Sequence, residues 1–163
     1  MSGRTQKQIG FKVSGLDSSL FDSLMNMSDE ELAELNACWL TADSYPGYPC
    51  RVSLQDIKKG EKVLALNYQH HDVKSPYRAS GPIFVGKHSR PVEWSENQIP
   101  DVMVSRLLSL RGYDKNGDMQ EACVTQGEAL TGDIIKILSN PQIAYIHAHN
   151  TIPGCFACRI DRV

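Results

Sequence analysis

The chain has 163 residues, of which 41% are hydrophobic and 22% charged, a composition typical of a globular protein that can bury a hydrophobic core. Its formal net charge of −2 argues against a broad nucleic-acid interface, which needs a clustered basic surface. No apolar stretch approaches the ~20 residues that cross a bilayer, so we also expect no membrane partner.

The N-terminus and the cysteines predict how the chain is organised and where it resides. Residues 1–8 are polar, with no apolar segment after the basic positions. We therefore expect a disordered tail instead of a signal peptide, followed by a single α+β domain over 9–163. An odd number of cysteines, five, without an export signal indicates free thiols in a reducing compartment. We expect a cytoplasmic protein.

The first part of the chain predicts a short strand and two short helices. Phe11 and Val13 mark the strand, Ser18 can cap the first helix, and Ser28 with Glu31 forms a capping box for the second. Residues 38–42 then have an extended pattern. Two prolines and a glycine within 45–49 predict a turn.

Strand-like runs dominate the middle of the chain. They cover residues 50–54, 62–68, 83–85 and 104–113. The polar stretch 88–100 predicts a long surface connection. Asn116-Gly117 predicts a hairpin turn that leads into a return strand at 121–124.

The last part of the chain contains the clearest helix, over 128–139, with Leu130, Ile134, Ile137 and Leu138 on one apolar stripe. Two strands, 143–149 and 155–162, follow it. Many short strands with few helices predict an α+β fold. We expect a mostly antiparallel sheet, which could curl toward a barrel, with short helices packed on it.

The last two predicted strands bring polar side chains to one face, because side chains alternate along a strand. If His149 pairs with Cys155, one face is apolar and Cys158 points into the core. The other face then carries Tyr145, His147, His149, Cys155, Arg159 and Asp161. Alternatively, a tight knuckle at Pro153-Gly154 would bring the sulfur of Cys158 to that of Cys155.

Three interpretations of this polar face compete. In the first, His147, His149 and Cys155 bind a metal such as zinc, with Cys50 or a water as the fourth ligand. In the second, Cys155 is a catalytic nucleophile or redox thiol, activated by a nearby histidine and by Arg159. In the third, the face is an ordinary polar surface or a structural corner.

Three further residues are candidate contacts for a ligand. Arg51 follows Cys50, and in a strand it would face away from the core and be free to bind an anion. Arg78 lies in a loop with a hydroxyl and a glycine, which could hold a phosphate or a carboxylate. His70 ends a strongly apolar strand, where polar residues often line a cleft. Together they favour a small anionic ligand.

Three segments together resemble a known family. They are GYPCRVSL at 47–54, YRASGPIF at 77–84, and HAHN at 147–150 followed by PGCFACR at 153–159. The chain resembles the bacterial family called domain of unknown function 1203 (DUF1203), from about Phe11 to Arg162. This resemblance implies a stand-alone small bacterial protein, and it implies no activity and no catalytic residues.

The sequence therefore predicts a small protein with a metal or small-anion site on its C-terminal hairpin, which would suit a thiol- or metal-dependent enzyme. The alternative is a non-catalytic binding or interaction module in which the hairpin has a structural role. A concave pocket holding the two histidines and Cys155 would favour chemistry, whereas an exposed apolar patch would favour the module.

Overall fold

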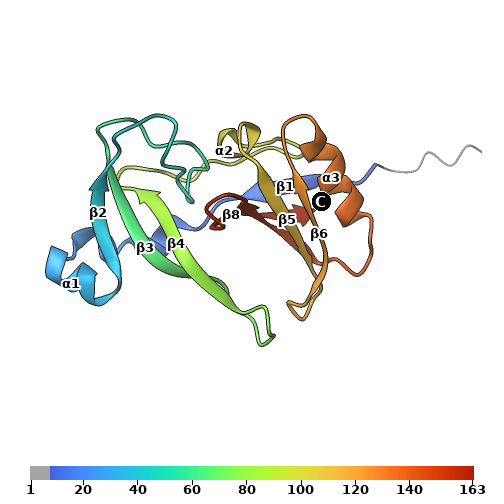
Figure 1. Cartoon of the computed structure of the whole chain (residues 1–163), viewed down its shortest axis with the longest axis horizontal. Coiled ribbons are helices and arrows are strands. Elements are labelled where there is room, and N and C mark those ends of the chain that lie inside the picture. The colour runs from blue at the N-terminus through green and yellow to red at the C-terminus, as the bar shows by residue number, and fades with distance from the viewer. Residues whose placement is uncertain (1–7) are drawn as a thin grey trace, which may run out of the picture.

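Two antiparallel sheets lie side by side in the computed structural model (Figure 1), which describes residues 8–163. The predicted disordered tail, apart from Gln8, lies outside the described residues. The elements in chain order are β1 (Phe11–Ser14), η1 (Ser18–Phe21), η2 (Leu24–Asn26), α1 (Asp29–Glu34), β2 (Ala37–Thr41), β3 (Lys62–His71), β4 (Ala79–Gly86), α2 (Asp101–Val104), β5 (Leu108–Tyr113), β6 (Met119–Thr125), α3 (Ala129–Leu138), β7 (Tyr145–Asn150) and β8 (Phe156–Arg162).

The larger sheet has five strands in the order β1-β8-β7-β5-β6, and α3 covers its outer face (Figure 1). The predicted apolar stripe of that helix is confirmed, because its four residues are all buried. They pack in one cluster with the alternate residues Ile146 and Ala148 of β7. The opposite side chains of β7 therefore point to the other face of the sheet, away from this core.

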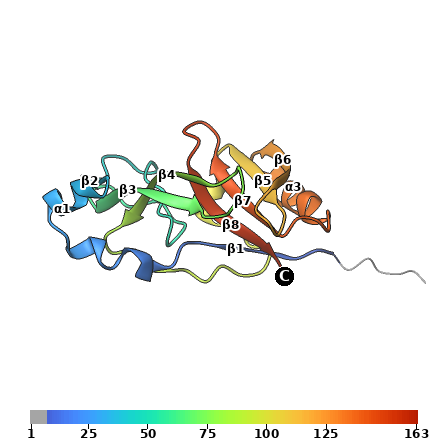
Figure 2. The same ribbon diagram turned by 90° about the horizontal axis from the view of Figure 1, so that it is seen from below.

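The smaller sheet has the order β2-β3-β4 and a core of its own, which includes Leu32 of α1. Its central strand is long: β2 pairs with β3 only as far as Leu66. Beyond that point β3 continues with β4 as a hairpin to His71. This hairpin reaches from the smaller sheet toward the larger one (Figures 1 and 2), and it carries the end of β3 to the candidate site.

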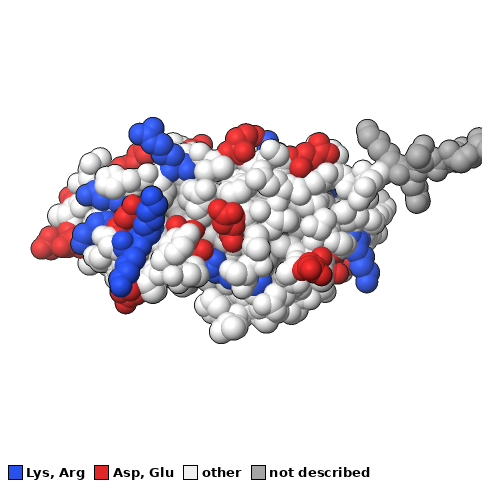
Figure 3. Space-filling view, turned by 90° about the horizontal axis from the view of Figure 1, so that it is seen from above, with Lys and Arg blue, Asp and Glu red and all other residues white. Residues whose placement is uncertain are grey.

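The predicted fold class, mostly antiparallel α+β with short helices, is confirmed. Both sheets are open: within residues 8–163, β1 and β6 are the edges of the larger sheet, and β2 and β4 those of the smaller. Neither sheet curls into a barrel. None of the helices in the described part of the chain has the length and apolar character of a membrane span. Figure 3 shows one face of the molecule, on which acidic and basic side chains are interspersed.

Two predicted strands are wrong in whole or in part. Residues 50–54 form a turn, in which the Leu54 amide donates to the Cys50 carbonyl and Leu54 takes a φ of 56°. Their apolar character reflects burial within that turn. The predicted strand 104–113 begins only at Leu108, because Pro100 opens the short helix α2 just before it.

The predicted pairing of His149 with Cys155 is also wrong. His149 pairs with Phe156, whereas His147 pairs with Arg159, and the register shifts between these two pairs. The shift reflects one extra residue in β8, Ala157, and such a bulge turns the residues before it to the opposite face. Phe156 therefore lies on the histidine face, and Cys155 falls in the turn before the strand.

The ion pair between Arg106 and Asp56 joins the turn that follows Cys50 to the segment between α2 and β5. It therefore provides a test of how these two parts of the chain are held together. Two bonds of 2.7 and 3.1 Å join the groups, and their side chains are 19% and 8% exposed. We expect Asp56→Ala to lower the free energy of unfolding by roughly 2–3 kcal/mol, somewhat less than for a fully buried pair.

The matched control is Asp72→Ala, which removes the exposed partner of Arg78 and should cost less than about 1 kcal/mol. Urea denaturation of the two variants measures both losses. Equal losses would show that the pair with Asp56 has no special structural role.

Candidate functional site

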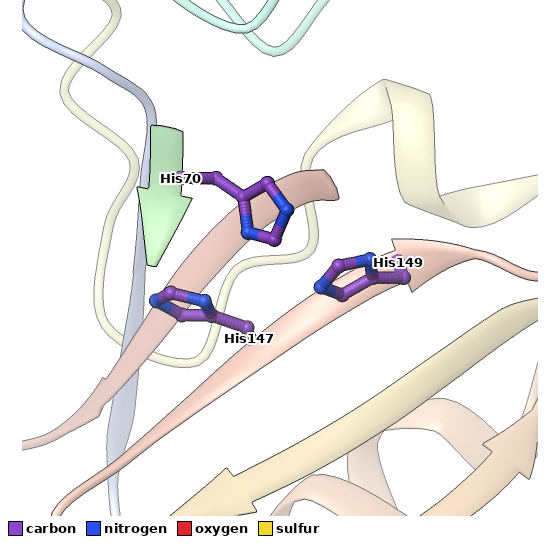
Figure 4. Close-up of side chains that lie close together, drawn as sticks. All are labelled: His70, His147 and His149. Carbon is purple, nitrogen blue, oxygen red and sulfur yellow. The ribbon is translucent and has the colours of Figure 1, made fainter. Parts of the chain in front are cut away.

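Three histidines from the two sheets converge at one place. His147 and His149 are two residues apart on β7 and so share one face of the larger sheet. His70 comes from the end of β3 and points toward them (Figure 4). One ring nitrogen from each of the three lies within 4.8 Å of the other two. The sequence predicted the first two as metal ligands, and His70 only as a ligand contact.

Phe156 forms the apolar side of this cluster. Its ring stacks on that of His70, with centroids 5.3 Å apart and an interplanar angle of 5°. The rings of His147 and His149 meet it edge-on at 4.9 and 5.9 Å. The β8 bulge is what turns Phe156 to this face, so sequence reasoning that assumed a regular strand missed its role.

The cluster is buried and its polar atoms are not fully paired. His147 and His149 are 4% and 2% exposed, and His70 is half-buried. Nδ1 of His70, Nδ1 of His147 and Nε2 of His149 are buried without a hydrogen-bond partner. Because buried polar atoms nearly always have a partner, three such nitrogens in one cluster point to a ligand that they bind together.

The structure also orients one of these rings. Nδ1 of His149 lies 3.1 Å from the carbonyl oxygen of Gly154. Since a carbonyl only accepts, Nδ1 carries the proton and the lone pair is on Nε2, the unpartnered atom. A backbone carbonyl that fixes the tautomer in this way is the usual outer partner of a metal-binding histidine.

The three histidines are neutral at physiological pH. Burial is the main cause that lowers the pKa of His147 to about 2, and it lowers the pKa values of His70 and His149 to about 4. Neighbouring histidines add to each shift, as does Arg111 for His70 and His149. Neutral imidazole is the form that binds metal, so the site needs no proton loss before coordination.

His71, next to the cluster, has a structural role. Its Nε2 lies 2.6 Å from the hydroxyl of Tyr145 and its Nδ1 lies 2.8 Å from the carbonyl of Tyr77. Its ring also packs on Tyr113, with centroids 4.1 Å apart. With both nitrogens engaged, His71 fixes the end of β3 against the larger sheet and thereby positions His70.

The other predicted metal ligands lie elsewhere. Cys155 contacts Arg51, with 3.0 Å between its sulfur and Nη2. The sulfur of Cys50 is buried and accepts from the backbone amide of Gly86. Neither sulfur belongs to the three-histidine group found among residues 8–163.

The remaining candidates have other partners, although Arg159 is the cross-strand neighbour of His147 and its charge contributes to the lowered pKa of that histidine. Arg159 pairs with Asp161 at 2.9 Å and lies over the ring of Tyr145. Arg78 is exposed and pairs with Asp72 at 3.5 Å. Cys158 is fully buried and contacts the sulfur of Met103 at 3.6 Å. Burial raises its pKa to about 12, so it is the core thiol that a regular strand predicted.

Fold and site together define a class: a small α+β protein with two open antiparallel sheets and a buried three-histidine group that could hold a metal. A family model described as protein of unknown function (DUF1203) matches residues 47–162, so the chain belongs to the DUF1203 family. No curated protein and no solved structure matches the chain.

The lowered pKa values predict how the metal-free protein responds to acid. Below the ordinary histidine pKa of 6.5, these histidines are protonated in the unfolded chain but remain neutral in the folded chain. Stability is therefore fully present above about pH 6.5 and is lost as the pH falls toward 4. The slope that His147 alone contributes should increase as the pH falls through 6.5 and approach about 1.4 kcal/mol per pH unit near pH 5.

Urea unfolding in the presence of a chelator, from pH 5 to 7, measures this slope. His147→Phe should reduce it, because Phe cannot be protonated. His88→Phe, at an exposed histidine outside the cluster, should leave it unchanged. Identical slopes in the parent chain and His147→Phe would contradict the lowered pKa of the buried ring.

Proposed function

We propose that this protein binds one transition-metal ion, zinc for preference, through His70, His147 and His149. The observation that carries the proposal is the convergence of three neutral ring nitrogens within 4.8 Å of one another. In a tetrahedral zinc site with Zn–N bonds of about 2.0–2.1 Å, ligand nitrogens lie roughly 3.3 Å apart. The three nitrogens would move closer together to reach that spacing when the ion binds.

The donor set supports the choice of metal. The group contains imidazole nitrogens and, among the described residues, no carboxylate or thiolate. Calcium and magnesium require oxygen ligands, whereas imidazole suits zinc, copper, iron and nickel. Zinc has no geometric preference from its d electrons, so three histidines from two different strands can hold it without a strict angular requirement.

Three protein ligands, instead of four, leave one position of a tetrahedral ion available. Catalytic zinc sites have this arrangement, in which the metal lowers the pKa of its bound water to about 7. Here the ligands are neutral, and the charge of Arg111 acts on two of the histidines. The excess positive charge would favour hydroxide or a small anion as the fourth ligand, which supports the small-anion contact that the sequence predicted.

Metal analysis of the chain purified without an affinity tag tests the proposal. We expect about one zinc per chain, and a binding titration with Zn²⁺ after chelator treatment should return to that ratio. Removal of one histidine, in His70→Ala, His147→Ala or His149→Ala, should weaken binding by more than about 100-fold, since loss of an outer partner alone costs roughly 10–100-fold.

His88→Ala is the matched control, since its ring is exposed and lies outside the cluster. It should bind zinc like the parent chain. Substoichiometric binding by the parent, or equal losses in His88→Ala and His149→Ala, would refute the metal site.

Zinc should also stabilise the fold, because the ligands come together only in the folded chain. At a free zinc concentration 100 times the Kd, linkage predicts a gain of about 2.7 kcal/mol. For a chain of this size that corresponds to a rise in Tm of roughly 5–11 °C. Thermal unfolding with Zn²⁺ and with Mg²⁺ measures the effect, and an equal rise with both ions would argue against a histidine site.

A further inference from the structure

A cleft of about 510 Å³ lies outside the histidine cluster, and its lining includes none of the three histidines. Its volume is within the usual range for small-molecule sites. Its walls are mostly apolar and come from segments that are distant in the sequence. The apolar residues include Pro49, together with Ile83 and Phe84 of β4, Leu107 before β5, and Ile152 and Pro153 of the β7–β8 turn.

Arg51 lies in the wall of this cleft and is 2% exposed. Its Nε donates to the carbonyl of Phe156 at 2.7 Å, its Nη1 to the carbonyl of Pro49 at 2.6 Å, and its Nη2 contacts the sulfur of Cys155 at 3.0 Å. A guanidinium has five N–H donors and stays charged, so these contacts leave donors available.

The charge of Arg51 has no carboxylate opposite it. The ion pairs of the described residues involve other arginines and lysines. A buried charge without a counter-charge is strongly unfavourable. Arg106, the second arginine of the cleft, is already paired with Asp56. The cleft therefore offers one buried positive charge, without a carboxylate partner among the described residues, in the wall of a mostly apolar space.

One other side chain supports a ligand in this space. Ile152 lines the cleft, yet 89% of its surface is exposed to solvent. Asn150 also lines the cleft and is 5% exposed, but its unpartnered Oδ1 is an acceptor and so offers no hydrogen bond to an anion. A buried positive charge and an exposed apolar rim are the features that an amphipathic anion would cover.

We propose that this cleft binds a small organic monocarboxylate with an apolar tail. The carboxylate lies on the free N–H groups of Arg51, and the tail lies against the β4 wall and Ile152. A single unpaired cation suits one negative charge better than the two of a phosphate. This proposal does not rest on the metal site, and the test below is run both with Zn²⁺ and with a chelator, so that failure of one proposal can be told from failure of the other.

Calorimetry with acetate, butyrate, hexanoate and octanoate tests the class of ligand. We expect each added methylene to tighten binding about fourfold until the cleft is filled, as expected for burial of apolar surface. Octanamide, which has the same tail without the charge, should bind at least tenfold more weakly than octanoate. Inorganic phosphate should not compete.

Variants test the contact with Arg51. Arg51→Met should abolish octanoate binding, whereas Arg78→Met, at an exposed arginine outside the cleft, should not change it. Because Arg51 is buried and its loss can unfold the chain, a second pair uses exposed Ile152. Ile152→Glu adds a negative charge at the rim and should bind octanoate at least fivefold more weakly than Ile152→Gln, which matches it in size.

Several results would overturn the proposal: affinity that does not depend on tail length, equal binding of octanamide and octanoate, competition by phosphate, or equal affinities of Ile152→Glu and Ile152→Gln. Another is a chain that binds no acid and whose Cys155 is alkylated by iodoacetamide faster than exposed Cys38. In that case a thiolate, and not a ligand, would be the counter-ion of Arg51.

Discussion

The histidine cluster exists because β3 continues beyond its own sheet and ends against the face of the other one. Past Leu66 the strand has lost its partner β2 and pairs only with β4. Such an extension would be free to bend if nothing held its end. His71 holds it, through Tyr145 and Tyr77 and through the ring of Tyr113. The position of His70, one residue earlier, follows from that attachment.

This arrangement has an energetic cost that the fold alone does not offset. Each buried nitrogen without a partner costs about 1–3 kcal/mol, and the cluster has three of them. Apolar side chains of similar size would fill the same space beside Phe156 without that cost. The histidines are thus poor choices for packing and good choices for coordination, since a metal ion would use all three lone pairs at once.

The sequence predicted those parts of the molecule that depend on local periodicity. The 3.6-residue repeat of apolar positions predicted α3 and its buried stripe. The two-residue alternation of side chains along a strand placed His147 and His149 on one face of β7. The polar end of an apolar strand marked His70. Each of these inferences uses residues within one element, where geometry follows directly from spacing.

The sequence failed where a local irregularity or a distant contact decides the outcome. One extra residue at Ala157 moved Phe156 to the histidine face, and no spacing rule predicts such a bulge. Residues 50–54 read as a strand because burial gives turn and strand the same apolar pattern. The contact of Arg51 with Cys155 joins residues 104 apart, and nothing in either segment indicates the other. Contacts between residues so distant in the sequence can be identified only from the folded structure.

The two candidate sites share one short piece of backbone, the turn between β7 and β8. The ring of Phe156 touches all three histidines, while its carbonyl accepts from Nε of Arg51. On the other side of Cys155, the carbonyl of Gly154 orients His149. A ligand that shifts the turn at one site would therefore alter the geometry of the other. Binding free energies are reciprocal. If a bound metal changes the affinity of the cleft for its ligand by some factor, that ligand therefore changes the affinity of the three histidines for the metal by the same factor.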